Sequence, residues 1–285
     1  MKHFFKDLYR SKAGLVGAIL IFIIVLVSLL APFIDLPDPT RGDLRARLVG
    51  PTWTGLFSPG AHPLGTDEVG RDILSRLING SRITLLVATT AVLLGGVAGT
   101  ILGILAGYKG GFIDRVLMRL VDIQLAVPLM LLALLVVAAL GPSLQNVVLV
   151  LALTSWIRYA RIIRAQVLSL REREFVQSAH AIGASTLRIM FLHILPNVLT
   201  PALVVGTLEL ARVIIMDSAL SFLGLGVQPP TPSWGRMLAD GRVYISSAWW
   251  AVTFPGLAIV LTVLSVNLFG DWLRDYFDPK TRSAK

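Results

Sequence analysis

Long apolar runs without a charged side chain restrict this chain to a membrane fold. Residues 13–34 contain 22 consecutive residues without Asp, Glu, Lys or Arg, and residues 83–108 contain 26. About 20 such residues suffice for a helix to cross the hydrocarbon core of a bilayer. The chain has 55% hydrophobic and only 15% charged residues, with a mean hydropathy of +0.74. These values exclude a soluble globular protein.

The same pattern predicts four further spans. Residues 123–157 are uncharged for 35 residues, and the Gly-Pro-Ser sequence at 141–143 indicates two spans joined by a tight turn. A fifth span is expected at about 196–220 and a sixth at about 248–270. We therefore predict an all-α, polytopic membrane protein with six transmembrane helices.

The fourth span is short at its carboxyl end. Its uncharged part, residues 144–157, covers only about 21 Å at 1.5 Å per residue. We expect Arg158 and Arg161 to extend their side chains to the membrane surface while the helix continues outward.

The distribution of Lys and Arg predicts which side each loop faces. Six spans place both termini on one side, and that side carries 17 basic residues against 8 on the other. Because basic residues concentrate in cytoplasmic loops, both termini and the segment 158–196 are predicted to be cytoplasmic. The first apolar run is longer than the core of a signal peptide, which favours an uncleaved anchor.

These features divide the chain into four parts. They are a cytoplasmic amino terminus with the first span (1–34), an extracytoplasmic loop with an amphipathic helix (35–82), a five-helix core (83–270) that includes the cytoplasmic segment 158–196 and an outer loop at about 221–247, and a cytoplasmic tail (271–285).

The extracytoplasmic loop contains the pattern of an interfacial helix. Thr66 is expected to cap it, with Asp67 and Glu68 in the first turn. Its apolar face would be formed by Val69, Ile73, Leu74, Leu77 and Ile78. His62 has no neighbouring His or Cys to complete a ligand set, so no metal site is predicted.

The basic segment 158–196 is too long to be a structureless loop, and its pattern indicates two short helices. Apolar residues recur at helical spacing on both sides of Gly183: Phe175, Ala179 and Ile182 before it, and Leu187, Met190, Phe191 and Ile194 after it. Glycine suits a backbone turn at that position. An amphipathic helical hairpin outside the bilayer is suited to docking a soluble partner.

Two groups inside the spans have a structural and a functional interpretation. The second span carries small residues at four-residue intervals, which permit close helix packing or line a pore: Gly95, Gly99, Gly103 and Gly107. In the fifth span, Glu209 and Arg212 share a helix face and Asp217 follows them. Such residues line a translocation path, or they form a neutralised pair that stabilises the bundle.

No catalytic site is visible in the sequence. The chain has no cysteine, which excludes disulfides and thiolate chemistry, and it lacks the motifs G-x-x-x-x-G-K-[ST], H-E-x-x-H and G-x-S-x-G. We predict that the chain is not an enzyme and holds no cofactor, so another polypeptide must hydrolyse any ATP that drives transport. The basic residues flank the spans, so the net charge of +9 reflects topology and not nucleic-acid binding.

Four ordered motifs carry a resemblance to a known family. They are H-P-L-G-T-D-E-V-G-R-D from His62, H-I-L-P-N ending at Asn197, D-S-A-L-S-F-L-G-L-G-V-Q-P-P-T-P-S-W-G from Asp217, and N-L-F-G-D-W-L-R-D-Y-F-D-P from Asn267. Over nearly its whole length the chain resembles permease subunits of binding-protein-dependent, ATP-driven (ABC) importers. It is similar to the second-subunit (DppC/OppC) type of the dipeptide, oligopeptide and nickel branch, which implies the type I (MetI-like) permease fold.

The resemblance assigns a role to the cytoplasmic segment. The family signature reads E-A-A-x-x-x-G followed by I-x-L-P, and it forms a coupling helix docked on the ATPase. The residues that it implies here are Arg173, Glu174, Gln177, Ser178, Ala179, Gly183, Leu195 and Pro196. Gln177 stands where the signature has Glu, Ser178 where it has Ala and His193 where it has Ile; the loss of the Glu charge leaves Arg173 and Glu174 as nearby substitutes.

The resemblance also implies partners and a mechanism. The expected assembly is a heterodimer with a homologous second permease, two cytoplasmic ATPases that bind ATP and Mg, and an extracytoplasmic substrate-binding protein, in a bacterial or archaeal cytoplasmic (inner) membrane. Transport would follow alternating access, with dipeptides, oligopeptides, nickel chelates or related small solutes as substrates.

Two other hypotheses remain open at this point. An ion-coupled secondary transporter would use Glu209, Arg212 and Asp217 as a relay, although no internal repeat is seen. A membrane scaffold would use the hairpin only to recruit a cytoplasmic protein.

Overall fold

The computed structural model describes residues 2–52 and 62–277, and within these ranges it is all-α apart from one isolated β-bridge. In these ranges five helices are long and apolar enough to cross a membrane, and a sixth span is present if one bent pair of helices is counted as one. The five are α2 (Lys12–Leu30), α3 (Ile73–Lys109), α6 (Leu144–Leu170), α9 (Leu195–Phe222) and α11 (Trp250–Phe277), and the bent pair is α4 (Gly111–Ala126) with α5 (Leu129–Leu140).

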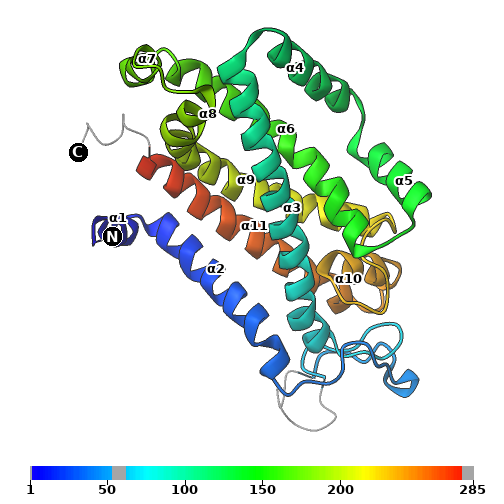
Figure 1. Cartoon of the computed structure of the whole chain (residues 1–285). Coiled ribbons are helices and arrows are strands. Elements are labelled where there is room, and N and C mark those ends of the chain that lie inside the picture. Colours follow the sequence, from blue (N-terminus) through cyan, green and yellow to red (C-terminus); the bar gives the residue numbers. More distant parts are fainter. Residues whose placement is uncertain (1, 53–61, 278–285) are drawn as a thin grey trace.

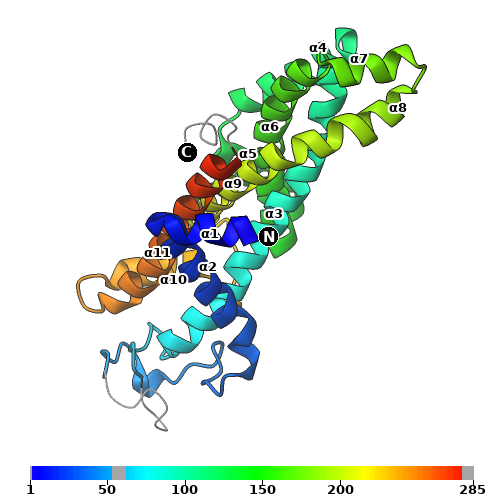
Figure 2. The same cartoon turned by 90° about the vertical axis from the view of Figure 1, so that its left-hand side faces the viewer.

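The short elements lie at the two ends of the bundle (Figures 1 and 2). They are α1 (Lys2–Arg10), η1 (Ala31–Phe33), η2 (Leu44–Ala46), α7 (Glu174–Ala181), α8 (Thr186–Arg188), η3 (Ile189–Ile194), α10 (Trp234–Gly241) and η4 (Arg242–Tyr244). We name the ends after α7 and α10. Helix α1 lies at the α7 end with the last turns of α11, because the Phe4 and Trp272 rings are 4.9 Å apart between centroids. Residues 278–285 of the expected tail lie outside the described part.

The tightest helix pair is α3 with α6, and the predicted glycine face forms it. A Cβ atom added at Gly95 would lie 2.7 Å from Ser155 Cβ, and one at Gly103 would lie 2.8 Å from the Ala160 carbonyl oxygen. Gly99 and Gly107 face α6 in the same way. The bare backbone therefore brings the two helix axes close, as small residues do in membrane bundles. All four glycines therefore lie in the contact between α3 and α6.

The third span differs from the continuous helix that we expected. It is bent by 90° between α4 and α5. Pro128 lacks an N–H group and disfavours helical backbone at the residue before it, and Val127 is extended at φ −91° and ψ 117°. The apolar run is therefore interrupted within the span, although its hydropathy is continuous.

The interfacial helix expected from Thr66 is wrong. Helix α3 begins at Ile73, where the Asp72 carboxylate accepts a hydrogen bond from the Ser75 N–H at 2.7 Å. It continues without interruption to Lys109, so the second span is 37 residues long. Gly70 has a φ of +78°, which a helix starting at Thr66 could not contain.

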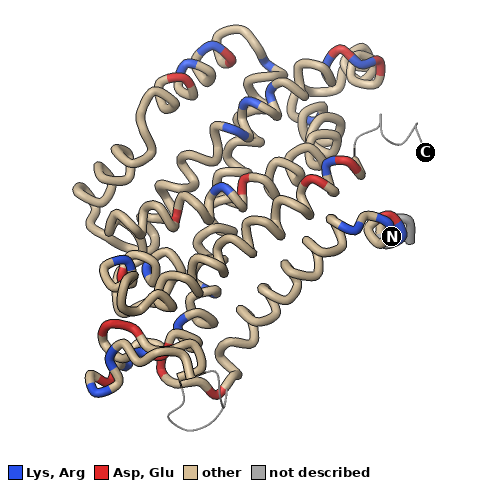
Figure 3. The backbone as a smooth tube through the Cα atoms, turned by 180° about the vertical axis from the view of Figure 1, so that it is seen from behind, with Lys and Arg blue, Asp and Glu red and all other residues tan. Residues whose placement is uncertain are grey.

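Charged residues gather at the two ends of the bundle, with a small group halfway along it (Figure 3). Between the ends, many large apolar side chains are exposed on the single chain, among them Leu93, Val97 and Leu135. Their surroundings are lipid or further subunits, because no soluble monomer exposes so much apolar surface.

Candidate functional site

Residues 174–196, which we call the elbow, lie at the α7 end between α6 and α9. Helix α7 covers residues 174–181 and ends before Gly183, whose φ of +84° turns the chain back. Helix α8 then begins at Thr186, after Ser185, whose hydroxyl accepts a hydrogen bond from the Arg188 N–H. The predicted break at Gly183 is confirmed.

The second half of the elbow is not a separate short helix. Residues 186–222 run through α8, the π-helical turn η3 and α9, and together pass as one membrane span. In η3 the Leu195 N–H bonds to the Met190 carbonyl five residues earlier. The second half of the elbow and α9 are therefore one continuous helical segment.

The apolar residues of the elbow divide into two sets. Val176 and Ala179 are buried against Ile189, Met190 and Ile194, which fixes α7 to the start of the long helix. Other apolar side chains are exposed on the chain: Phe175 (40%), Ile182 (85%), Leu187 (63%) and Phe191 (58%). The expected single apolar stripe is therefore only partly correct, because some of its members serve the internal core.

Most of the implied coupling residues are accessible. Ala179 is buried and Leu195 is half-buried, whereas the other six are exposed: Arg173, Glu174, Gln177, Ser178, Gly183 and Pro196. No ion pair within the described part of the chain engages Arg173 or Glu174. Their charges therefore remain available to a partner.

Gln177 makes a contact that a glutamate could not make. Its side-chain amide donates a hydrogen bond to the Glu172 backbone carbonyl at 3.2 Å, and a carboxylate has no proton to donate. An open cavity of about 940 Å³ separates α7 from the α3–α4 junction, and Tyr108, Arg171 and His180 are among its lining residues. Gln177 therefore helps to hold the start of α7 beside this cavity.

Two ion pairs that the sequence did not indicate brace α6 against α4. Arg164 forms a two-pronged pair with Asp114, and Arg161 Nη2 lies 2.6 Å from Asp122 Oδ1. Together with the apolar contact of Val121 with Ile157 and Ala160, these pairs connect the bent third span to the helix that enters the elbow.

Glu209 and Arg212 form the predicted pair, and Arg158 joins them. Arg212 Nη1 donates to Glu209 Oε1 at 2.5 Å, and Arg158 Nε lies 3.6 Å from Glu209 Oε2. Arg158 lies about 21 Å along α6 from its α10 end, and Glu209 about 20 Å along α9 from the same end, at 1.5 Å per residue. Arg158 therefore meets Glu209 near the middle of both helices, and not at their α7 end.

Asp217 does not join this group. It lies two turns closer to the α10 end, is fully buried, and neither carboxylate oxygen has a hydrogen-bond partner in the described part of the chain. Close by, α9 packs on α10, where a Cβ at Gly235 would lie 2.8 Å from Ser218 Cα. The relay of three residues that the sequence suggested is therefore not assembled.

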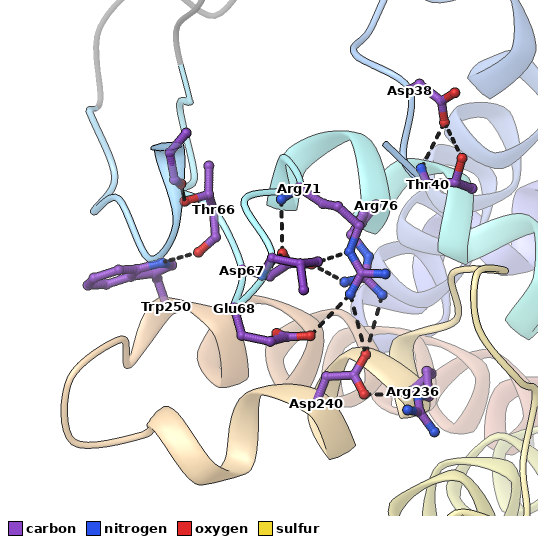
Figure 4. Close-up of polar contacts among 12 residues, drawn as sticks. Asp38, Thr40, Thr66, Asp67, Glu68, Arg71, Arg76, Arg236, Asp240 and Trp250 are labelled. Carbon is purple, nitrogen blue, oxygen red and sulfur yellow. Dashed lines mark hydrogen bonds and ion pairs between the residues drawn. The ribbon is translucent and has the colours of Figure 1, made fainter. Parts of the chain in front are cut away.

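The run from His62 to Asp72 forms a compact, hydrogen-bonded loop at the α10 end (Figure 4). The Trp250 indole N–H donates to the Thr66 carbonyl at 3.1 Å, and His62 Nδ1 lies 3.1 Å from Asp72 Oδ2. Gly70 has its Cα against the Asp43 carbonyl, leaving no room for a Cβ. The run therefore positions the loop, α3 and α11 relative to one another.

A buried charge network lies at the centre of this loop. Asp67 accepts from Arg71 Nε at 2.7 Å and also from Arg76, and Asp240 of α10 lies 3.6 Å from Arg76 and 2.9 Å from Arg236. The Arg76 side chain is 2% exposed. This network fixes α10 to the start of α3, a relation that the sequence did not reveal because the partners are far apart along the chain.

Glu68 is the least well compensated member of this network. Burial, followed by the nearby charge of Asp67, raises the pKa of Glu68, although Arg71 Nη2 lies 3.1 Å away. One of its oxygens, Oε2, is buried without a hydrogen bond.

Comparison with known proteins identifies the family. Residues 99–283 match the family model described as "Binding-protein-dependent transport system inner membrane component", and residues 1–51 match the "N-terminal TM domain of oligopeptide transport permease C". The chain belongs to this family of membrane transport components. The resemblance seen in the sequence is confirmed, and with it the permease fold.

Relatives match this permease along almost its full length. It is 44% identical over 284 residues to a "Di/tripeptide transport system permease protein DppC" of Pseudomonas aeruginosa, covering 100% of this chain and 93% of the relative. It is 46% identical over 280 residues to the "Dipeptide transport system permease protein DppC" of Escherichia coli, covering 98% and 92%. The protein is therefore an ABC importer permease, which sets aside the ion-coupled and scaffold hypotheses.

Proposed function

We propose that this permease imports dipeptides as the second permease subunit of a binding-protein-dependent ATP-driven transporter. The observation that carries the substrate class is full-length similarity, above 40% identity, to permeases named for dipeptide transport. Selection among peptides then depends largely on the binding protein that delivers them.

The proposed assembly contains a homologous second permease, two cytoplasmic ATPases and an extracytoplasmic binding protein. ATP and Mg bind in the ATPases, and this chain itself performs no catalysis and requires no cofactor. Support for partners comes from the exposed apolar side chains along the helices and on the elbow, which a single chain leaves uncovered.

In the proposed orientation the α7 end and both termini face the cytoplasm. Placing Arg158 within the membrane still leaves 13 basic residues toward the α7 end against 8 toward the α10 end in the described part of the chain. The α10 end, with its charge network, then faces the binding protein.

The elbow is proposed to transmit the closure of the ATPases. An ATPase groove holds the exposed face of α7 and the chain around Ile182, and the α7 core contacts make the elbow stiff. Because α8, η3 and α9 are continuous, a push on the elbow tilts α9, while α6 follows through its connection at Arg171. This tilt opens the path alternately to each side.

Reconstitution tests the proposal. Proteoliposomes containing both permeases and both ATPases are supplied with the binding protein outside and ATP inside, and uptake of labelled dialanine is measured. The proposal predicts uptake that requires every subunit and is inhibited by vanadate. Uptake that persists without the ATPases, or a complete complex that hydrolyses ATP but imports no dipeptide, contradicts it.

A further inference from the structure

The group formed by Arg158, Glu209 and Arg212 carries an excess positive charge. Glu209 is the only carboxylate that contacts either arginine in the described part of the chain. One carboxylate cannot neutralise two guanidinium groups, which stay charged at any relevant pH. The group therefore carries one net positive charge at mid-depth, where an uncompensated arginine costs about 3 kcal/mol.

The two arginines differ in how far Glu209 engages them. Arg212 is hydrogen-bonded to Glu209 at 2.5 Å. Arg158 lies at 3.6 Å, too far for a hydrogen bond, so none of its donors is engaged by another residue that the structure describes. The Arg158 side chain is 56% exposed, whereas that of Glu209 is 2% exposed. The unengaged N–H groups of Arg158 are therefore exposed on the chain, midway along the helices. Lipid tails at that level offer no hydrogen-bond acceptor.

The neighbouring Tyr159 holds this arrangement in place. It is 4% exposed and lies between α3 and α9. A Cβ at Gly96 of α3 would lie 3.0 Å from Tyr159 Cζ, and one at Gly206 of α9 would lie 2.9 Å from the Tyr159 hydroxyl. Because these two positions have no side chain, the Tyr159 ring fits between α3 and α9. The ring therefore fixes the rotation of α6 about its axis and keeps Arg158 beside Glu209.

We propose that Arg158, supported by the Glu209–Arg212 pair, binds the carboxylate terminus of the peptide during its passage. This inference rests on the proposed function as a dipeptide importer. A guanidinium fork matches a carboxylate with two parallel hydrogen bonds, and the extra positive charge is neutralised when the anion arrives. Because only one guanidinium group on a half-exposed side chain binds the peptide carboxylate, the interaction is weak enough for the peptide to be released.

The experiment compares uptake of dialanine with uptake of dialanine amide, which lacks the carboxylate, in the complete reconstituted transporter. For each substrate, the uptake rate of Arg158→Gln is divided by the uptake rate of the unaltered protein. Because both measurements use the same binding protein, its preference for one substrate does not affect this ratio. Arg161→Gln is the matched control, because Arg161 is 50% exposed on the same helix but paired with Asp122. Arg158→Lys tests rescue by charge.

We expect Arg158→Gln to lower dialanine uptake roughly tenfold or more, as the loss of a charge-assisted hydrogen bond predicts, and to lower uptake of the amide less than about twofold. Arg158→Lys should restore part of the dialanine rate, and Arg161→Gln should leave the ratio between substrates unchanged. The inference is overturned if Arg158→Gln lowers the uptake of both substrates equally or lowers neither. These results are also expected if an acidic residue of the second permease neutralises Arg158. If the unaltered complex imports neither substrate, the proposed function has failed instead.

Accessibility provides a second readout that does not depend on transport. The chain has no cysteine, so Arg158→Cys creates a single reporter within it. In a complex whose other subunits lack cysteine, the thiol should react with a charged, water-soluble reagent, and saturating binding protein with dialanine and ATP should slow the reaction. A thiol that never reacts in a correctly assembled complex overturns the inference.

Discussion

The carboxylate of Asp240 in α10 lies 3.6 Å from the guanidinium of Arg76 at the start of α3, in a network centred on Asp67. Asp67→Asn should lower the free energy of unfolding by about 3 kcal/mol, because it leaves two arginines buried without their main counter-charge. Denaturant unfolding in mixed micelles measures this. Asp38→Asn is the control, since Asp38 is exposed and contacts only Thr40 and its neighbours. Similar stability for both variants would contradict the central role of Asp67.

Glu68 should make stability depend on pH. Because its pKa is raised in the folded protein, the folded state holds this proton more tightly than the unfolded state does. Its contribution is therefore most favourable below about pH 4 and is lost as the pH rises through the raised pKa. The stability of the unaltered protein relative to Glu68→Gln should fall as the pH rises from about 4 toward neutrality. A difference that stays constant or rises over that range would be inconsistent with the burial of Glu68.

Two helical glycines should respond in opposite ways to alanine. Gly99→Ala should destabilise the protein by about 1–3 kcal/mol, because the new methyl group meets the Trp156 carbonyl of α6. Gly256→Ala should be neutral or stabilising by up to about 1 kcal/mol, because its nearest neighbour lies 3.9 Å away and alanine favours helix. Thermal unfolding of the two variants measures the difference. Equal changes in stability would contradict the prediction and show that α3 and α6 can move apart to accommodate the methyl group.

Much of this architecture could be predicted from the sequence because its cause is local. Hydropathy located the long helices, the glycine interval indicated the α3 seam, and Gly183 indicated the turn in the elbow. The spacing of Glu209 and Arg212 within one helix was enough to predict their pair.

The errors have a common physical origin in contacts between distant segments. Residues 62–72 form a loop where the sequence predicts a helix from Thr66. The loop forms because Asp67 binds Arg71 and Arg76, and because Gly70 contacts Asp43. The contact of Arg158 with Glu209 was missed because Glu209 belongs to another span. Pro128 was available in the sequence as a signal for the bend of the third span.

Docking to the ATPase should depend on apolar contact at the elbow. Ile182 is 85% exposed, so Ile182→Ser should weaken co-purification of the ATPases without changing the folding of the permease. Val243→Ser, at a residue 74% exposed near the α10 end, is the matched control. Quantitative pull-down of the ATPases measures both. Equal retention of ATPase by the two variants would place the docking surface elsewhere.

The most direct test measures ATP hydrolysis and dialanine uptake together for Gly183→Val. Gly183 has a φ of +84° and no neighbour within 4 Å of an added Cβ, so valine distorts the elbow turn without a clash in the core. Gly141→Val is the control, since Gly141 has a φ of +78° and equal free space at the other end of the bundle. Our account predicts that Gly183→Val inserts and assembles normally but imports severalfold fewer dipeptides per ATP hydrolysed than Gly141→Val does. An unchanged number of dipeptides imported per ATP in Gly183→Val would contradict coupling through a stiff elbow.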